Sequence, residues 1–495
     1  MTLEQLKLFT IAPEIALFVL LAAVMLADAF LKKRSEVLVH MGSLAGLVFI
    51  GLWQMLDALT ISPAIGMNGL VVVDPMAALL KSGASFATAV TLVYARRTLA
   101  DQSMAFGAYH LFALFSLLGG FVMISANHLL TVYLGVELLS LALYAAVALR
   151  RESAVSTEAA MKDFVLGALA SGFLLYGMSM IYGATGALEI TAIQDKLAAG
   201  NADRLVMVFG TVFLVAGLAF KLGVVPFHMW VPDVYQGAPT ATALLIGAAP
   251  KLAAYAIVIR LLVSGLFGVA ADWQQMLLVL CVLSLLVGNL VAIMQTNLKR
   301  ILAYSTIAHM GFMLLAIASG VLGEKTDGAV NAYAASMFYV LTYVLTTLGS
   351  FGVILLASSR GYEFDTLDDF KGLAKTKPML AWVMLALVFS LAGIPPTVGF
   401  YAKLAVLESA VAAGYVGLAV FAVLASLIGA FYYLRIVKVM FFDDPVVRAP
   451  EQMQCPIQRS ILSANGVAVV ALGIVPGPLM AWCVLAVRSS LAPEL

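Results

Sequence analysis

The chain of 495 residues is 63% hydrophobic and 11% charged, with a formal net charge of +1. Soluble domains carry about 25% charged residues, so lipid is the solvent that this much apolar surface requires. The near-neutral charge excludes a basic face for nucleic acid. The three cysteines are far apart and form no CxxC pair, which argues against disulfide frameworks, zinc sites and iron–sulfur ligation. No nucleotide-binding or metalloprotease motif is present in the sequence.

Apolar segments of spanning length follow one another along the chain. A spanning helix needs about 20 mostly apolar residues. The first such run, after Pro13, is long enough to span rather than to be cleaved as a signal peptide. The sequence predicts an all-α polytopic membrane protein of about 14 transmembrane helices, with both termini on one side. The helices are expected to begin near residues 12, 36, 75, 108, 129, 160, 205, 240, 274, 300, 328, 378, 417 and 460.

Lysine and arginine residues orient these helices. Of the 28, 18 fall in the odd-numbered connections and 5 in the even-numbered connections and the termini. Because basic residues concentrate in cytoplasmic loops, the odd connections should face the cytoplasm and both termini the periplasm. The basic residues of the odd connections are at 32–34, 96–97, 150–151, 162, 299–300, 360, 371, 375, 377, 435, 438, 448 and 459, and the others include Lys325.

Two pairs of segments recur at one spacing. GVVPFHMWVPD (223–233) and GIPPTVGFYAK (393–403) share a G-x-x-P frame, and the offset between them also aligns NHLL (127–130) with NLKR (297–300). Helices 5 and 10, and 7 and 12, are then equivalent. Five is an odd number, so the copies must be inverted, as in transporters with paired interrupted helices. For either pair alone, chance in a chain with 40 Gly and 16 Pro would be the better explanation.

The repeat divides the chain into four predicted units. Residues 1–107 hold three N-terminal helices, 108–265 the first five-helix repeat (helices 4–8), and 266–442 the second, inverted repeat (helices 9–13). Residues 443–495 hold a cytoplasmic loop and helix 14. Helices 7 and 12 are expected to be discontinuous.

Lys221 lies in the middle of an overlong segment. Residues 205–235 would span about 46 Å as an unbroken helix, against a hydrocarbon thickness of about 30 Å. Lys221 is therefore too deep to reach the headgroups easily. Pro226 breaks the helix shortly afterwards, and broken backbone is tolerated at this depth only beside protein or water. Lysine and break together predict a small hydrated cavity.

Three further charges are expected inside the membrane. Lys251 follows Pro250 in the middle of helix 8, and Lys403 follows the second break. Glu137 is ninth in its span and is the only acid expected deep in the first half. A carboxylate at this depth needs a nearby cation or takes up a proton.

Other ionisable residues are weaker candidates. His309 is mid-span in helix 10 and could relay protons, although a core histidine bonded to a helix carbonyl is an equal alternative. His228 could line the cavity at the first break, and Lys162 could reach inward from the start of helix 6. Lys81 and Arg260 are expected to be anchors that reach the headgroups.

Buried lysines together with a glutamate are the composition of a proton path, because burial makes a lysine proton easier to move. The sequence shows no redox or nucleotide site, so the energy must come from another polypeptide or from an ion gradient. At the offset of the repeat, Lys221 aligns with Leu391 and Glu137 with Ile307. The two repeats therefore share a backbone but do not share charge positions.

Long motifs along the whole chain resemble one family, subunit N of bacterial NADH–quinone oxidoreductase, respiratory complex I. The resemblance implies fourteen helices, two inverted five-helix repeats and broken helices 7 and 12. It also implies an antiporter-like proton channel in a multi-pass protein of the bacterial inner membrane. The motifs are GLAFKLGVVPFHMWVPDVYQGAPT, NHLLTVYLGVELLSL, EAAMKDFVLGALASGFLLYGMS, NLKRILAYSTIAHMGF and SLAGIPPTVGFYAK.

By the same resemblance, the subunit belongs to a proton-translocating enzyme but has no redox site of its own. No cofactor is expected in this chain, and NADH, FMN, iron–sulfur clusters and quinone are expected in other subunits. The antiporter-like subunit M and the small subunit K are the expected partners. The family's proton-path residues correspond to Glu137, Lys162, Lys221, Lys251 and Lys403.

Two alternatives remain. The chain could be a stand-alone type of cation/proton antiporter subunit. It could also be a structural subunit that does not pump, or a transporter of small solutes, although its membrane spans hold few of the polar side chains that a solute pocket needs.

Overall fold

The computed structural model describes residues 7–31, 35–102, 104–200, 202–321, 326–358, 362–445 and 455–491. Some of the basic residues used to orient the predicted helices lie outside the described residues. These are the residues at 32–34, 325, 360 and 448.

Among the described residues of the N-terminal part and the first repeat, the regular elements are helices and one small antiparallel hairpin. In chain order, the elements are η1 (Leu8–Ile11), α1 (Ala12–Phe30), α2 (Ser35–Thr60), β1 (Ala64–Gly66), β2 (Val71–Val73), α3 (Pro75–Asp101), α4 (Phe106–Ser125), α5 (Leu129–Val147), α6 (Ala154–Thr185), α7 (Ile190–Ala198), α8 (Arg204–Leu222), α9 (Trp230–Gly237), α10 (Thr240–Gly247), α11 (Ala249–Val258) and the π-helical η3 (Ile259–Gly265).

In the second repeat and the C-terminal part, the regular elements of the described residues are all helices. Their elements are η4 (Phe267–Val269), α12 (Ala270–Ile293), α13 (Leu298–Ser319), α14 (Thr326–Ala357), η5 (Leu367–Phe370), α15 (Leu373–Thr376), α16 (Pro378–Ala392), α17 (Val398–Ala412), α18 (Val416–Phe442), α19 (Pro456–Ile474) and α20 (Gly477–Leu491).

The predicted fourteen spans are confirmed. Helix 7 is α8 with α9, helix 8 runs from α10 through η3, and helix 12 is α16 with α17. Thirteen helices of the described residues are long and apolar enough to span by themselves, and helix 12 is not among them because its break divides it. Helix 6 begins earlier than expected, because the Ser153 side chain accepts a hydrogen bond from the backbone N–H of Ser156 and caps α6 at Ala154.

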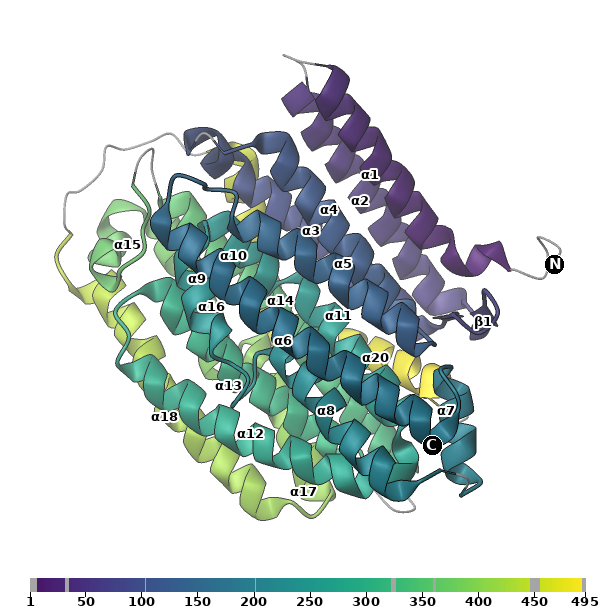
Figure 1. The fold of residues 1–495 in the computed structure, drawn as a ribbon. Coiled ribbons are helices and arrows are strands. Elements are labelled where there is room, and N and C mark those ends of the chain that lie inside the picture. Colours follow the sequence, from purple (N-terminus) through teal and green to yellow (C-terminus); the bar gives the residue numbers. More distant parts are fainter. Residues whose placement is uncertain are drawn as a thin grey trace.

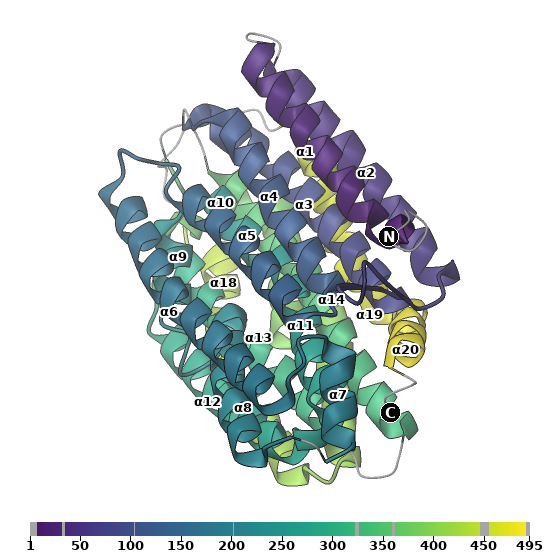
Figure 2. The ribbon, with the colours of Figure 1, turned by 45° about the vertical axis from the view of Figure 1, so that its right-hand side comes forward.

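The helices form a packed bundle with two peripheral N-terminal helices (Figure 1). Helices α1 and α2 lie along one edge in both ribbon views (Figure 2). The most apolar window of Thr240–Gly265 is 94% buried inside the protein, against 28% for Leu8–Phe30. Helix 8 is therefore part of the core, and the first helices present most of their surface outward, as lipid-facing helices do.

Odd- and even-numbered connections meet at opposite ends of the bundle. At one end, which we call the Arg150 face, Glu363 of the connection between helices 11 and 12 contacts Arg150, Lys299 and Gln102 from three other odd connections. At the other end, the Glu189 face, Asn127 of the 4–5 connection donates hydrogen bonds to Glu189 and to the carbonyl oxygen of Gly69, both from even connections. The predicted alternation is confirmed.

Lys7 and Arg488, near the two ends of the described chain, both lie on the Glu189 face. Lys7 donates a hydrogen bond to the carbonyl oxygen of Ile65 in the 2–3 connection, and Arg488 pairs with Asp327 at the start of α14. The two described ends of the chain are thus on one side, as the even helix number requires.

The two breaks are equivalent, as the repeat predicts. Gly223 follows α8 with φ 76°, and Gly393 follows α16 with φ 82° at the matching position of the second repeat. Each glycine N–H bonds to the carbonyl four residues back, at 2.9 Å in both cases. A left-handed glycine at this position is a common way to end a helix, so both copies use the same device.

A second structural match supports the repeat. Residue His128, before α5, forms an isolated β-bridge with Glu189, and Asn297, before α13, forms one with Thr366. In each copy the start of the second repeat helix is therefore fixed to the segment that follows the third. The sequence anchor Asn297 forms one of these bridges, and the anchor Asn127 directly precedes the bridge residue of the other.

Helix 14 contains a third interruption that the sequence analysis did not anticipate. Helix α19 ends at Ile474 and α20 begins at Gly477, with Pro476 between them. A Cβ added at Gly473 would overlap the carbonyl oxygen of Pro396. The end of α19 therefore packs directly against the backbone of the second break, and only glycine permits that approach.

Candidate functional site

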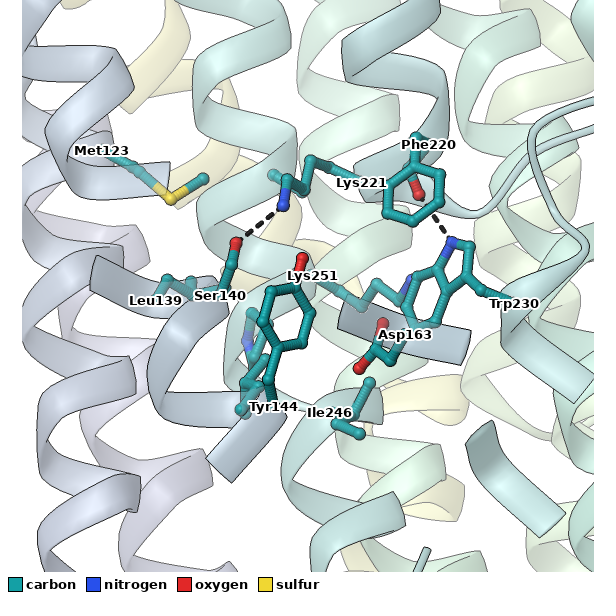
Figure 3. A pocket seen from close by; sticks show the side chains of 13 residues that line it. Met123, Leu139, Ser140, Tyr144, Asp163, Phe220, Lys221, Trp230, Ile246 and Lys251 are labelled. Carbon is teal, nitrogen blue, oxygen red and sulfur yellow. Dashed lines mark hydrogen bonds between the residues drawn. The ribbon is translucent and has the colours of Figure 1, made fainter. Parts of the chain in front are cut away.

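A cavity of about 40 Å³ lies beside the first break (Figure 3). This volume is enough for a few water molecules. Its polar lining comes from several helices, α5, α6, α8, α9 and α11. The residues of the lining that carry polar groups are Ser140, Tyr144, Asp163, Lys221, Trp230 and Lys251.

Lys221 enters this cavity at the end of α8. Its ammonium group donates a hydrogen bond of 2.6 Å to the hydroxyl of Ser140 on α5 (Figure 3). The Ser140 hydroxyl in turn donates to the carbonyl oxygen of Val136. The helix end also favours a cation, because the last carbonyls of α8 carry partial negative charge. Helix break and lysine are brought together as the sequence predicts.

Glu137 does not contact Lys221 in the described structure. It lies on α5 and interacts with Lys221 only electrostatically, and its Oε1 atom is buried without a hydrogen-bond partner among the described residues. The hydroxyl of Ser140, three residues further along the same helix, takes the ammonium group instead. Direct pairing of Glu137 with Lys221 therefore remains a prediction for another state of the protein.

Asp163 is a buried acid that the sequence analysis missed. Its side chain is 4% exposed and lines the cavity, and its charge interacts with those of both Lys221 and Lys251. Glu137 is thus not the only deep acid of the first half. The expected start of helix 6 near residue 160 placed Asp163 in the first turn, whereas the observed start at Ala154 places it about two and a half turns in.

Lys251 is almost completely buried, with 2% of its surface exposed. Its ammonium group donates a hydrogen bond of 2.9 Å to the carbonyl oxygen of Leu222, the last helical residue of α8. It also lies 5.7 Å from the centre of the Trp230 ring, in cation–π contact. Helix 8 therefore places a cation against the free end of helix 7.

Lys162 is outside the cavity. Its side chain is 43% exposed and pairs with Glu158 at 2.9 Å and with Asp233 at 2.8 Å. Arg300 at the start of α13 contacts the same Asp233 carboxylate at 2.7 Å. The network joins the two repeats near the Arg150 face. The neighbouring residue, Asp163, takes the inward position that was expected for the lysine.

A second ionic group on the Arg150 face surrounds Lys299. This buried ammonium contacts Asp365 at 3.2 Å and Glu363 at 3.7 Å, and donates to the carbonyl oxygen of Ala238 at 3.3 Å. Burial is the largest effect on Asp365 and raises the pKa of that carboxyl above its usual value, despite the opposing charge of Lys299. The start of helix 10 is thereby held against the end of helix 7.

His309 is buried at the centre of a hydroxyl network. Its Nδ1 atom lies 2.6 Å from the hydroxyl of Tyr339 and its Nε2 atom 3.2 Å from that of Tyr433. Two cavities of about 10 Å³ each adjoin it, and the second also reaches Lys403. The imidazole therefore bonds to tyrosines rather than to the helix carbonyl that we considered as an alternative.

Lys403 lies just beyond the second break. Its ammonium group contacts the carbonyl oxygens of Leu391 and Ala392 and the hydroxyl of Ser426. No carboxylate is among the described residues that line its cavity. The ammonium groups bond to neutral oxygens at both breaks, but only the first cavity also has a carboxylate, Asp163, among its described lining residues.

The remaining candidates are placed differently from one another. His228 is half-buried at the first break, and its Nδ1 atom has no hydrogen-bond partner among the described residues. The anchor role expected for Lys81 and Arg260 is wrong. Lys81 is 1% exposed and pairs with Glu14 at 2.6 Å, and Arg260 is 4% exposed and pairs with Asp74 at 2.6 Å. Acids on other elements, the partly buried Glu14 and the buried Asp74, hold both cations inside the bundle.

Comparison with known proteins decides the family. Residues 126–429 match the family described as NADH:quinone oxidoreductase/Mrp antiporter, TM. NADH-quinone oxidoreductase subunit N of Paraburkholderia phymatum is 52% identical over 491 residues, which cover 99% of this chain and 100% of that protein. The chain belongs to the subunit N family of NADH-quinone oxidoreductase. Subunit N of Herminiimonas arsenicoxydans is 54% identical over 494 residues, again 99% and 100% of the two chains.

Solved structures agree with this membership. A chain of respiratory complex I from Thermus thermophilus superposes with a TM-score of 0.79 at 32% identity, covering 95% of this chain and 98% of that one. A chain of the Mrp complex from Dietzia has the same TM-score at 24% identity, covering 100% and 98%, and shows a shared fold. The predicted family resemblance and the all-α membrane fold with inverted repeats are confirmed.

Proposed function

We propose that this chain is the proton-translocating membrane subunit of a bacterial NADH–quinone oxidoreductase. Electron transfer from NADH to quinone takes place in other subunits, which hold FMN, the iron–sulfur clusters and the quinone site. This chain contributes proton transfer through buried Lys and Glu or Asp residues. The complex acts as a translocase, and this subunit carries no redox step.

One observation carries the proposal. Two lysines and one aspartate from three different helices line a single small cavity at the broken end of helix 7. Charges in a bilayer interior cost several kcal/mol, so their presence beside an interrupted helix is typical of ion handling. A rigid scaffold would be better served by apolar packing at this position.

The proposed path runs through both repeats. Glu137, Asp163, Lys221 and Lys251 form its first part, and His309 with its tyrosines and Lys403 form its second. Lys162 becomes a weaker member because its side chain is 43% exposed and pairs with Glu158 and Asp233, and His228 stays a weaker one. A proton moves when an ammonium group gives it to a water molecule or a neighbouring base, and the lysine then regains one from the other side.

The finer assignments are also part of the proposal. The four units are residues 1–107, 108–265, 266–442 and 443–495. The protein is a multi-pass protein of the inner membrane, with the Arg150 face toward the cytoplasm and both termini toward the periplasm, and its partners are the antiporter-like subunit M and the small subunit K. The 18-to-5 distribution of basic residues supports this orientation.

The test is proton uptake per NADH oxidised in inverted membrane vesicles. Lys251→Ala and Lys403→Ala should each lower this ratio strongly while the complex still assembles. Lys196→Ala is the control, because Lys196 is an exposed residue in the last turn of α7. A variant at either buried position that pumps like the wild type with normal electron transfer would remove that residue from the path.

The stand-alone antiporter is the second candidate, because the matched family covers both kinds of complex and the Mrp chain shares the fold. Mild purification from the native membrane separates the two. Recovery of the chain together with NADH dehydrogenase activity supports the complex I assignment. Recovery without it, together with sodium–proton exchange in vesicles, would favour the antiporter.

A further inference from the structure

All three N–H donors of the Lys403 ammonium group have a hydrogen-bond acceptor. Its Nζ atom lies 2.9 Å from the carbonyl oxygen of Leu391, 2.9 Å from that of Ala392 and 2.8 Å from the hydroxyl of Ser426. A protonated lysine has three N–H donors, so each donor has one acceptor. Hydrogen bonds from a charged donor are about twice as strong as neutral ones.

The helix break provides two of these acceptors. Helix α16 ends at Ala392, and the last carbonyl groups of a helix have no partner within it and carry partial negative charge. Gly393 then turns the chain, and a Cβ at that position would lie 2.8 Å from the Cδ atom of Lys403. The glycine therefore both frees the carbonyls and leaves room for the lysine stem.

Ser426 provides the third acceptor from a separate helix, α18. Its hydroxyl is 3.4 Å from the carbonyl oxygen of Ala392, which it can reach as a donor. With its proton directed there, its lone pairs face Lys403. The serine is therefore oriented to accept from an ammonium group.

At the first break, the equivalent backbone carbonyl accepts a hydrogen bond from a lysine on a different helix. Leu222, which occupies the position of Ala392 in the first repeat, accepts from Lys251 at 2.9 Å. Lys251 lies on helix 8, the next spanning helix after the broken helix 7. Leu222 is its one hydrogen-bond partner among the described residues. The remaining donors are free to face water in the cavity. In the second repeat, helix 13 (α18) contributes only the Ser426 hydroxyl. The lysine lies on α17, the second half of the broken helix 12.

We propose that the carbonyl oxygens of Leu391 and Ala392 and the hydroxyl of Ser426 form a preorganised site for a primary ammonium group, in which Ser426 is a positioning residue that keeps Lys403 protonated. This inference rests on the proposed role of Lys403 in proton transfer. Lys403 gives up its proton only by breaking one of three charge-assisted bonds, and the proton passes to a water molecule in the adjoining cavity. The neutral amine retains two N–H groups.

Few other groups near Lys403 could influence its protonation. The titratable groups near Lys403 are His309 on α13, Tyr433 on α18 and, beyond the imidazole, Tyr339 on α14. The Phe312 ring centre lies 5.3 Å from Nζ. Among the described residues of this cavity there is no carboxylate to hold the cation, so the loss of one hydroxyl should be measurable.

The experiment compares three variants at position 426 in inverted vesicles of the assembled complex. Proton uptake per NADH oxidised is followed across a pH series. Ser426→Ala removes the acceptor, so uptake should fail at a pH about one unit lower than in the wild type. Ser426→Thr keeps the hydroxyl and should restore the wild-type profile. Ser426→Cys, whose sulfur is a weak acceptor of similar size, should shift the profile in the same direction as alanine and serves if the alanine variant does not assemble.

Ser409→Ala is the matched control. Ser409 lies on α17 with Lys403, but its hydroxyl donates to the carbonyl oxygen of Ala405 at 2.9 Å. Its removal should leave the pH profile unchanged. Profiles of Ser426→Ala and Ser426→Cys that coincide with the wild type would overturn the inference, as would equal shifts in the alanine and threonine variants.

Lys403→Ala separates this inference from the function on which it rests. If Lys403→Ala abolishes pumping and Ser426→Ala changes nothing, only the positioning role fails. If Lys403→Ala pumps normally, the proposed role of Lys403 in proton transfer fails as well.

Discussion

Lys251 on helix 8 donates a hydrogen bond of 2.9 Å to the carbonyl oxygen of Leu222, the residue at which the first half of helix 7 ends. The cation could serve only to satisfy this helix end, or it could also exchange its proton. The two roles make different demands on the side chain. A helix end needs a positive donor, whereas proton exchange needs a group that can lose its charge.

Replacement of Lys251 by arginine distinguishes these roles. Arginine keeps the charge and the donors but does not release its proton in proteins. We expect Lys251→Arg to assemble and to lower the rate of proton uptake by roughly tenfold, the factor that corresponds to about 1.4 kcal/mol in a rate constant. Lys196→Arg, at an exposed residue of α7, is the control. Wild-type uptake in Lys251→Arg would assign the residue to helix capping alone.

Asp163 should be coupled to Lys221 more strongly than Glu137 is. Asp163 lines the same cavity as the lysine, and Glu137 does not. Double-mutant cycles with Asp163→Asn, Glu137→Gln and Lys221→Ala measure this on the rate of proton uptake. Neighbouring residues in one network show coupling of about 0.5–3 kcal/mol. Equal coupling of both acids, or a larger value for Glu137, would mean that the cavity geometry does not represent the pumping state.

Breaking the buried pair of Asp74 and Arg260 by removing one partner should strongly destabilise the protein. The two side chains are 1% and 5% exposed, and Asp74→Asn would leave the arginine buried without a counter-charge. Such losses cost about 3–5 kcal/mol. The measurement is the thermal denaturation midpoint and the yield of the purified complex.

An exposed pair provides the comparison. Asp272 lies 3.8 Å from Arg204, whose side chain is 81% exposed, so Asp272→Asn should cost under about 1 kcal/mol. A midpoint for Asp74→Asn as high as that for Asp272→Asn would show that lipid or water reaches Arg260.

Cysteine labelling tests the orientation. Thr376 is exposed on the Arg150 face and Ala199 is exposed at the end of α7 on the Glu189 face. Thr376→Cys should react with an impermeant thiol reagent from the cytoplasm and Ala199→Cys from the periplasm. The background carries Cys455→Ser, since Cys281 and Cys483 are buried. The reverse pattern would invert the topology and leave the fold unchanged.

The sequence predicted the helices well because the bilayer imposes a strong constraint on length and hydropathy. The two breaks were predictable for a related reason, since Gly223 with Pro226 and Gly393 with Pro396 interrupt apolar segments at one spacing. The third break had a similar signal at Pro476. It was missed because no second copy of the pattern drew attention to it.

The partners of the charges were less predictable. Whether Lys221 meets Glu137 or Ser140 depends on how α5 is rotated, and no property of the sequence fixes that rotation. Asp163 was missed because the start of α6 was placed too late in the chain, and each residue of such an error moves a side chain by about 1.5 Å along the helix axis. Lys81 on α3 was misassigned because its acid, Glu14, comes from α1, a helix that is not its neighbour in the chain.

The contact between Gly473 and Pro396 shows that the C-terminal segment covers the backbone of the second break. Backbone groups freed by a helix break cannot face hydrocarbon without a large penalty. Helix α19 lies against the second break and closes part of it from the surrounding lipid. A chain shortened before α19 would expose this polar backbone to lipid tails and give water a route to Lys403. The C-terminal segment therefore limits passive proton leakage through the protein. Its loss should make the membrane leak protons even when no NADH is oxidised.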